Sequence, residues 1–113
     1  MKMNNITLDF GTLQLSAELF DTKVAKAFHK NLPYSIDLTL WGNEAYGPIG
    51  ADLGEEHPIP TIPPGGLAYT RQGNYFCIFF GQQPAWPVEY IGTMSGDWKK
   101  LVGNRTITRV SIT

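Results

Sequence analysis

Residues Ile6-Thr7-Leu8-Asp9-Phe10-Gly11-Thr12-Leu13-Gln14-Leu15-Ser16-Ala17-Glu18-Leu19 alternate between apolar and polar side chains on both sides of a Gly-Thr step. Alternation with a period of two places every second side chain on one face of a strand. Two such runs separated by a short glycine turn are typical of a β-hairpin with one buried face. This stretch therefore predicts a mainly β protein.

The same pattern continues along the rest of the chain. Residues Tyr75 to Phe80 differ because all six are apolar, which predicts a strand that is covered on both faces. We predict seven or eight short strands in all. The first begins close to the N-terminus and the last ends close to the C-terminus, so their pairing would close a barrel and remove both sheet edges. The further predicted strands are residues 34–41, 67–70, 88–93 and 106–112.

One amphipathic helix interrupts the strands. Val24, Ala25, Phe28 and Leu32 repeat at helical spacing after Asp21, which we expect to be the N-cap. The residue before a proline is disfavoured in helical geometry, so the helix should end at Leu32. We expect it to lie across the mouth or the side of the barrel.

Composition and charge exclude several functions. The chain has 113 residues, which fits one domain over residues 1–113, and its net charge is −1. A near-neutral chain lacks the excess of Lys and Arg that nucleic-acid binding or electrostatic membrane binding needs. Because the sequence shows no signal peptide and its single cysteine, Cys77, looks buried, we expect a cytoplasmic protein. Both a monomer and a homodimer remain open.

The sequence lacks the strong catalytic and cofactor-binding signatures. It contains no phosphate-binding loop, no dinucleotide fingerprint, no serine-hydrolase elbow and no H-E-x-x-H zinc motif. His29, His57 and Cys77 alone do not make a usual zinc site. We therefore expect no metal and no cofactor.

The first candidate site is the segment from Trp41 to Tyr46, which follows a predicted strand. Glu44 has three interpretations: a general base, a hydrogen-bond acceptor for a ligand, or an ordinary exposed acid. Trp41 and Tyr46 either wall a pocket or cover the rim of the core. Both side chains carry a polar group on an aromatic body, which suits half-exposed positions.

The second candidate site is the segment from Phe80 to Pro87. Gln82 offers hydrogen-bond donors and acceptors, and prolines on both sides hold Trp86 stiffly. The segment is either a ligand-contact loop or a rigid turn whose tryptophan plugs the barrel end. Arg71 lies in a nearby turn, where it is either solvated or available to bind an acidic or carbonyl group.

Several segments together resemble a known family, the small bacterial and archaeal cyclophilin-like domain proteins. The resemblance runs from Leu19 to about Val110, and its W-G-x-E-x-Y and F-F-G-x-x-P motifs are the most specific. It implies a closed cyclophilin-like β-barrel of about eight strands with one capping helix, and it implies no particular reaction. The matching segments are the helix end at Leu32-Pro33 and residues 40–46, 65–69, 77–84 and 90–97.

True cyclophilins are peptidyl-prolyl isomerases that use an arginine in an F-H-R segment ahead of a Q-G-G stretch. This sequence has neither segment. It retains paired phenylalanines like those that wall the cyclophilin proline pocket, so a weak isomerase using Phe76, Phe80 and Arg71 is one hypothesis.

Our leading hypothesis is a barrel that binds a small molecule or a short peptide without isomerase catalysis. The cleft we predict for it is lined by Trp41, Glu44, Tyr46, Tyr69, Phe80, Gln82 and Trp86. A third hypothesis is a structural or interaction module whose proline-rich segment 58–64 docks on a partner.

Overall fold

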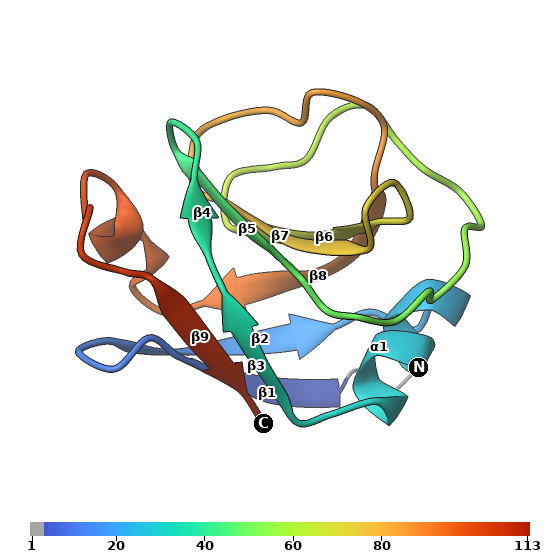
Figure 1. Cartoon of the computed structure of the whole chain (residues 1–113), viewed down its shortest axis with the longest axis horizontal. Coiled ribbons are helices and arrows are strands. Elements are labelled where there is room, and N and C mark those ends of the chain that lie inside the picture. Colours follow the sequence, from blue (N-terminus) through green and yellow to red (C-terminus); the bar gives the residue numbers. More distant parts are fainter. Residues whose placement is uncertain (1–3) are drawn as a thin grey trace.

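The computed structural model describes residues 4–113, which form a nearly closed barrel of nine antiparallel strands (Figure 1). The order around the sheet is β3-β9-β1-β2-β8-β6-β7-β5-β4. This confirms the predicted mainly β barrel, with one strand more than the upper predicted count. The strands are β1 (Asn4–Asp9), β2 (Gln14–Leu19), β3 (Tyr34–Asp37), β4 (Thr39–Leu40), β5 (Glu44–Pro48), β6 (Gly66–Thr70), β7 (Tyr75–Phe79), β8 (Glu89–Ser95) and β9 (Arg109–Ile112).

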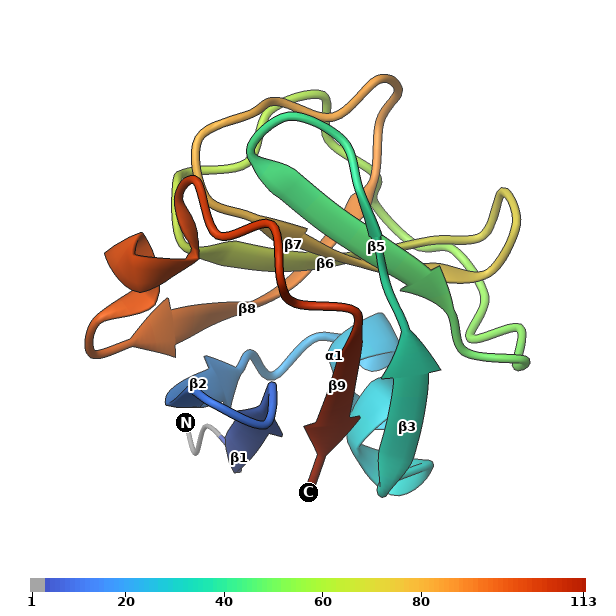
Figure 2. The ribbon, with the colours of Figure 1, turned by 60° about the vertical axis from the view of Figure 1, so that its left-hand side comes forward.

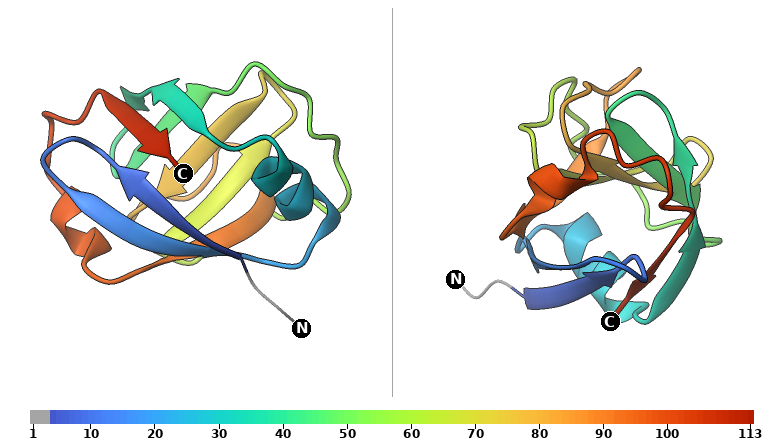
Figure 3. Two further views of the ribbon diagram at one scale, coloured as in Figure 1. Left: turned by 90° about the horizontal axis from the view of Figure 1, so that it is seen from below. Right: turned by 90° about the vertical axis from the view of Figure 1, so that its left-hand side faces the viewer.

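The predicted hairpin and the pairing of the first and last strands are both confirmed. β1 and β2 pair from Asn4 opposite Leu19 to Asp9 opposite Gln14, and β1 also pairs with β9. The ring of strands remains open between β3 and β5. These two strands come close at Gly47, where a Cβ atom would lie 2.0 Å from the backbone oxygen of Asp37. Only glycine allows this approach, so Gly47 helps the wall to close. The right-hand view of Figure 3 shows the resulting ring of strands.

The helix α1 (Lys23–Lys30) and the 3-10 helix η1 (Trp98–Leu101) lie at opposite ends of the barrel (Figure 3). Phe28 extends from α1 into the interior and stacks on Phe76 with 5.0 Å between ring centroids. The expectation that Asp21 is the N-cap was wrong. Thr22 is the cap, because its side chain accepts from the Ala25 amide at 3.2 Å, whereas Asp21 pairs with Lys26.

Two predicted strands are shorter than expected. The predicted strand 34–41 divides into β3 and β4 at Leu38, whose amide donates to the Thr108 carbonyl at 2.8 Å. The predicted strand 106–112 begins only at Arg109, because the Asn104 side chain holds the preceding residues by accepting from the Thr106 amide and hydroxyl. A helix ending at Leu32 was also too long, since α1 ends at Lys30.

The barrel wall formed by β5, β6 and β7 has an apolar layer on each face. Phe76, Ile78 and Phe80 point into the main core inside the barrel. Cys77 and Phe79 point outward into a second buried cluster with Ile62, Ala68 and Val88. The segments 49–65 and 81–88 arch over this outer face (Figures 1 and 2). The prediction that residues 75–80 are covered on both faces is therefore confirmed.

Candidate functional site

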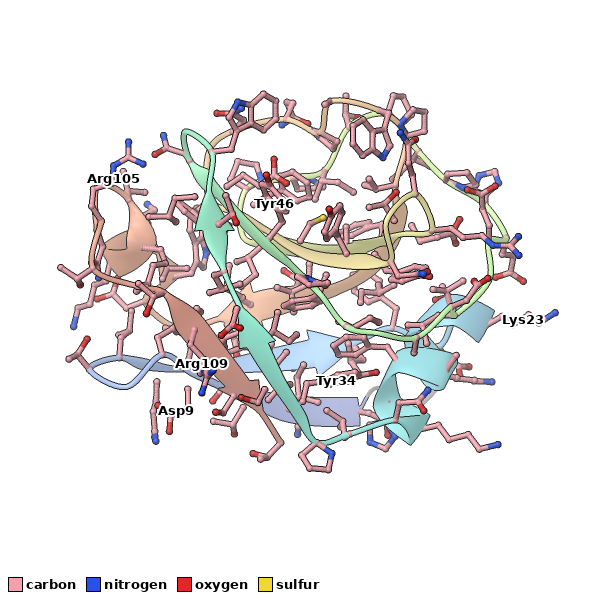
Figure 4. All side chains as sticks on the ribbon, in the orientation of Figure 1. Asp9, Lys23, Tyr34, Tyr46, Arg105 and Arg109 are labelled. Carbon is pink, nitrogen blue, oxygen red and sulfur yellow. The ribbon has the colours of Figure 1, made fainter. Side chains whose placement is uncertain are left out.

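A pocket of about 370 Å³ lies in the outer layer, between the outer face of β5–β7 and the covering segments; we call it the lateral pocket. Figure 4 shows Tyr46 on β5 below these segments, away from Lys23 and Tyr34 at the helix end. Small-molecule sites commonly measure about 300–1,000 Å³, so the lateral pocket has the size for a small ligand. Its lining residues are Trp41, Glu44, Tyr46, Thr70, Tyr75, Cys77, Phe79, Pro84, Ala85, Trp86 and Val88.

A tight turn carries Trp41 and Glu44 into the pocket wall. The backbone groups of Trp41 and Glu44 exchange two hydrogen bonds, of 2.9 and 3.2 Å, across Gly42 and Asn43. Gly42 has a φ of +60°, the positive value that a two-residue hairpin turn favours at its first central position. The Asn43 carbonyl accepts from the Phe80 amide at 2.9 Å, which ties the turn to the end of β7.

Glu44 is the buried acid of the pocket. Only 6 % of it is exposed, and it lies opposite Phe79 in the β5–β7 register. Within residues 4–113, its Oε1 atom has no hydrogen-bond partner. Burial raises the pKa of Glu44 from 4.5 to about 7, although the neighbouring Cys77 thiol lowers it somewhat. A carboxyl group of this kind can exchange a proton or accept a hydrogen bond near neutral pH.

The Cys77 thiol is kept protonated by the same surroundings. Burial raises its pKa, and the adjacent Glu44 carboxylate raises it further. Since the thiolate is the reactive form of cysteine, Cys77 acts as a small apolar wall residue.

Two tryptophans stand at the solvent side of the pocket. Trp41 is 47 % exposed and Trp86 is 39 % exposed. The indole N–H of Trp86 donates to the Thr70 hydroxyl at 2.9 Å, which fixes its ring over the β6 end of the pocket. Ligand binding could therefore bury aromatic surface that is already held in place.

Side-chain hydrogen bonds fasten the covering segments to the barrel. The Gln83 amide group both accepts from the Ile62 amide at 2.9 Å and donates to its carbonyl at 3.0 Å. The buried Glu89 carboxylate accepts from the amides of Glu56 and His57 at 3.2 and 2.8 Å. The long segment rich in glycine and proline is thus anchored to the sheet, and it closes the outer layer.

The structure brings together only part of the predicted site. Of the nine predicted residues, Trp41, Glu44, Tyr46 and Trp86 line the lateral pocket. Gln82 lies beside it, where its side-chain oxygen accepts from the Asn43 amide at 3.3 Å and supports the turn.

The other four predicted residues lie elsewhere. Tyr69, Phe76 and Phe80 are buried in the main core inside the barrel. Arg71 is exposed and pairs with Asp52 at 3.1 Å. Phe76, Phe80 and Arg71 therefore do not share one cleft.

Sequence reasoning missed five lining residues. The sequence feature that could have identified three of them is the alternation of side chains along Tyr75–Phe80. It places residues 75, 77 and 79 on the face opposite residues 76, 78 and 80. All six are apolar, so the sequence did not show which set faces the loops. The missed residues are Thr70, Tyr75, Cys77, Phe79 and Val88, whereas Pro84 and Ala85 belong to the second candidate segment and line the pocket.

Two kinds of feature are absent from residues 4–113. No group of three or more His, Cys, Asp or Glu side chains in this part of the chain is arranged to hold a metal ion. Neither does any helix there have the length and apolar character to cross a membrane.

These features define a class of protein: an antiparallel β-barrel capped by one helix, with a pocket on the outer face of its wall. Residues 4–113 match the family model described as Cyclophilin-like, and the chain belongs to this family. A search of curated proteins finds no match.

Two solved structures are similar to the chain. The hypothetical protein AF2241 from Archaeoglobus fulgidus has 22 % sequence identity and a TM-score of 0.73, over 97 % of this chain and 92 % of that one. McbB in complex with tryptophan has 14 % identity and a TM-score of 0.72, over 95 % of this chain and 43 % of that one. The chain thus spans less than half the length of the McbB chain. At these identities both structures show the fold alone.

Proposed function

We propose that this protein binds a small molecule, or the side chains of a short peptide, in the lateral pocket without isomerase catalysis. One observation carries the proposal: the buried Glu44 carboxylate has an oxygen without a partner within residues 4–113, and it lines a pocket walled by aromatic rings. Glu44 would orient the ligand by accepting a hydrogen bond, and the rings would supply contact area.

Folding alone does not favour this arrangement. A buried polar group without a hydrogen bond costs about 1–3 kcal/mol, and more when it is charged. Perturbed carboxyl groups of this kind are concentrated at functional sites. A ligand that donates a hydrogen bond to Oε1 would remove the cost.

The similar fold of McbB gives further support. Its structure holds tryptophan, an aromatic small molecule. Aromatic small molecules are therefore the first ligand class to test in the lateral pocket.

The isomerase hypothesis lacks comparable support. Its polarising cation, Arg71, is exposed and paired with Asp52, while Phe76 and Phe80 lie in the core. No Arg lines the lateral pocket within residues 4–113.

Binding can be tested by screening a library of small aromatic compounds against ¹⁵N-labelled protein. The three tryptophan indole N–H signals report the site directly: Trp41 and Trp86 line the lateral pocket, whereas Trp98 packs against the main core and is the internal reference. We expect saturable shifts of the Trp41 and Trp86 signals with Trp98 unchanged.

A matched pair of variants locates the binding. Ala85→Phe fills the pocket from its exposed edge and should abolish the shifts, whereas Lys30→Phe on α1 adds the same ring elsewhere and should preserve them. Absence of any saturable shift in the unmodified protein, or equal binding by both variants, would refute the proposal.

A further inference from the structure

We propose that the lateral pocket selects ligands in which a cationic amine is attached to an aromatic or apolar body, and discriminates against anionic ligands of the same shape. The inference rests on the proposed function and adds the chemical class of the ligand. In the complex, the ligand ammonium group donates to Glu44 while its apolar body packs between the aromatic walls.

The charges around the pocket carry the first part of the argument. Among the residues that the structure describes, Glu44 is the one lining residue with a carboxyl group, and none of the lining residues is Lys, Arg or His. The neighbouring cations lie outside it: Arg71 pairs with Asp52, and Arg105 is exposed and contacts the Gly42 carbonyl at 3.5 Å. An anionic ligand would add a second negative charge to a desolvated site without a cation to offset it, whereas an ammonium group would neutralise Glu44.

The aromatic walls of the pocket also favour a positively charged ligand. The faces of aromatic rings carry negative potential and attract cations within about 6 Å of the ring centroid. Tyr46 and Tyr75 stand edge to face, with 5.3 Å between their centroids, on the β5 and β7 side of the pocket. The five aromatic lining residues are Trp41, Tyr46, Tyr75, Phe79 and Trp86.

The hydrogen-bonding groups agree with the charges. Oε1 of Glu44 needs a donor, and an ammonium group supplies three. The indole N–H of Trp86, which could have bound an anion, is already used by the Thr70 hydroxyl. The remaining titratable groups that line the pocket are Cys77, Tyr46 and Tyr75. Burial raises the pKa of the Cys77 thiol and keeps it neutral, so the Glu44 carboxylate is the charge that a ligand meets.

Three ligands that share an indole ring and differ in charge test the inference. Tryptamine, tryptophol and indole-3-propionate each carry a two-carbon chain on an indole, and they end in an ammonium, a hydroxyl and a carboxylate. We would titrate each into ¹⁵N-labelled protein at pH 8 and fit Kd from the Trp41 and Trp86 signals. Tryptamine should bind at least tenfold more tightly than tryptophol, and indole-3-propionate should bind most weakly.

The variant Glu44→Gln keeps the shape of the side chain and removes its charge. It should lower tryptamine affinity to about that of tryptophol, while tryptophol binding stays within about threefold and shows that the pocket is intact. If all three ligands bind equally, if the carboxylate binds best, or if tryptamine affinity survives in Glu44→Gln, the inference is wrong although the proposed function stands. If none of the three binds at millimolar concentration while the library screen gives saturable shifts, the inference is wrong and the proposed function stands; if neither experiment gives shifts, both are wrong.

Discussion

Glu44 and Phe79 lie opposite each other on β5 and β7, so a carboxylate and a fully buried phenyl ring share the outer face of the barrel wall. This pairing explains the electrostatics of the site. The apolar neighbour helps to exclude water from the carboxyl group, and the resulting desolvation raises the pKa of Glu44 to about 7. The same face forms the floor of the lateral pocket.

The burial of Glu44 predicts that stability depends on pH. The folded protein holds the Glu44 proton up to a pKa of about 7, whereas the unfolded chain releases it near 4.5. The contribution of protonated Glu44 is therefore complete below about pH 4.5, declines as the pH rises towards 7, and is lost above it. The rise in pKa corresponds to at most about 3 kcal/mol.

The variant Glu44→Gln removes this titration. Chemical denaturation at pH 5 and pH 8.5 should show a smaller loss of stability on raising the pH in the variant than in the unmodified protein. If both proteins respond identically to pH, Glu44 is solvated and the description of the site is incorrect.

The apolar layers on both faces of the β5–β7 wall predict that Phe76 and Phe79 contribute about equally to stability. Phe79 packs in the outer cluster and Phe76 in the main core, and both are at most 1 % exposed. Each substitution by alanine should cost about 3–5 kcal/mol of unfolding free energy, measured by denaturant titration. A cost below about 1 kcal/mol for Phe79→Ala, with the full cost for Phe76→Ala, would show that the outer layer is open.

The turn that carries Glu44 depends on the contact between Gly42 and Gln82. A Cβ atom on Gly42 would lie within 1.8 Å of the Gln82 side-chain oxygen, and Gly42 has a positive φ. Gly42→Ala should therefore cost more in the unmodified protein than in the Gln82→Ala background, where only the backbone penalty of about 1–2 kcal/mol remains. A double-mutant cycle measures the difference, and additive effects would show that the Gln82 side chain moves aside without cost and does not hold the turn.

Glu89 should control the order of the segment above the outer layer. Its carboxylate accepts from the backbone amides of Glu56 and His57, so Glu89→Ala leaves both donors without that partner. We expect a loss of about 1–3 kcal/mol and faster hydrogen exchange at these two amides. The amide of Leu53, which bonds to Tyr69 in the same segment, is the control and should change less. Unaltered exchange at residues 56 and 57 would rule out this anchoring role.

The elements that the sequence predicts well are those whose physical cause is local. Alternation over residues 6–19 identifies the hairpin, and the spacing of Val24, Ala25 and Phe28 identifies the buried face of the helix. The predicted position of the N-cap was wrong by one residue, because the side chains of Asp21 and Thr22 are both suited to capping a helix. Only the geometry shows that the Thr22 oxygen reaches the Ala25 amide.

The site was predicted less completely because it depends on long-range geometry. Trp41, Glu44 and Tyr46 belong to one short segment, so local sequence grouped them correctly. Tyr69 was placed in the same predicted cleft, but its strand turns it into the core. Every residue of β7 is apolar, so its sequence does not show which face lines the pocket. That depends on how β7 pairs with β5, which no local pattern contains.

Direct measurement of the Glu44 pKa tests the central claim, that a buried carboxyl group whose Oε1 atom has no partner within residues 4–113 lines the lateral pocket. The side-chain carboxyl carbon of Glu44 can be followed by ¹³C NMR across a pH titration, with Glu44→Gln used to assign the signal. We predict a pKa of about 7 for the protein alone and a lower value with saturating tryptamine, because the ammonium group stabilises the carboxylate. A pKa near 4.5 that tryptamine leaves unchanged would contradict the account.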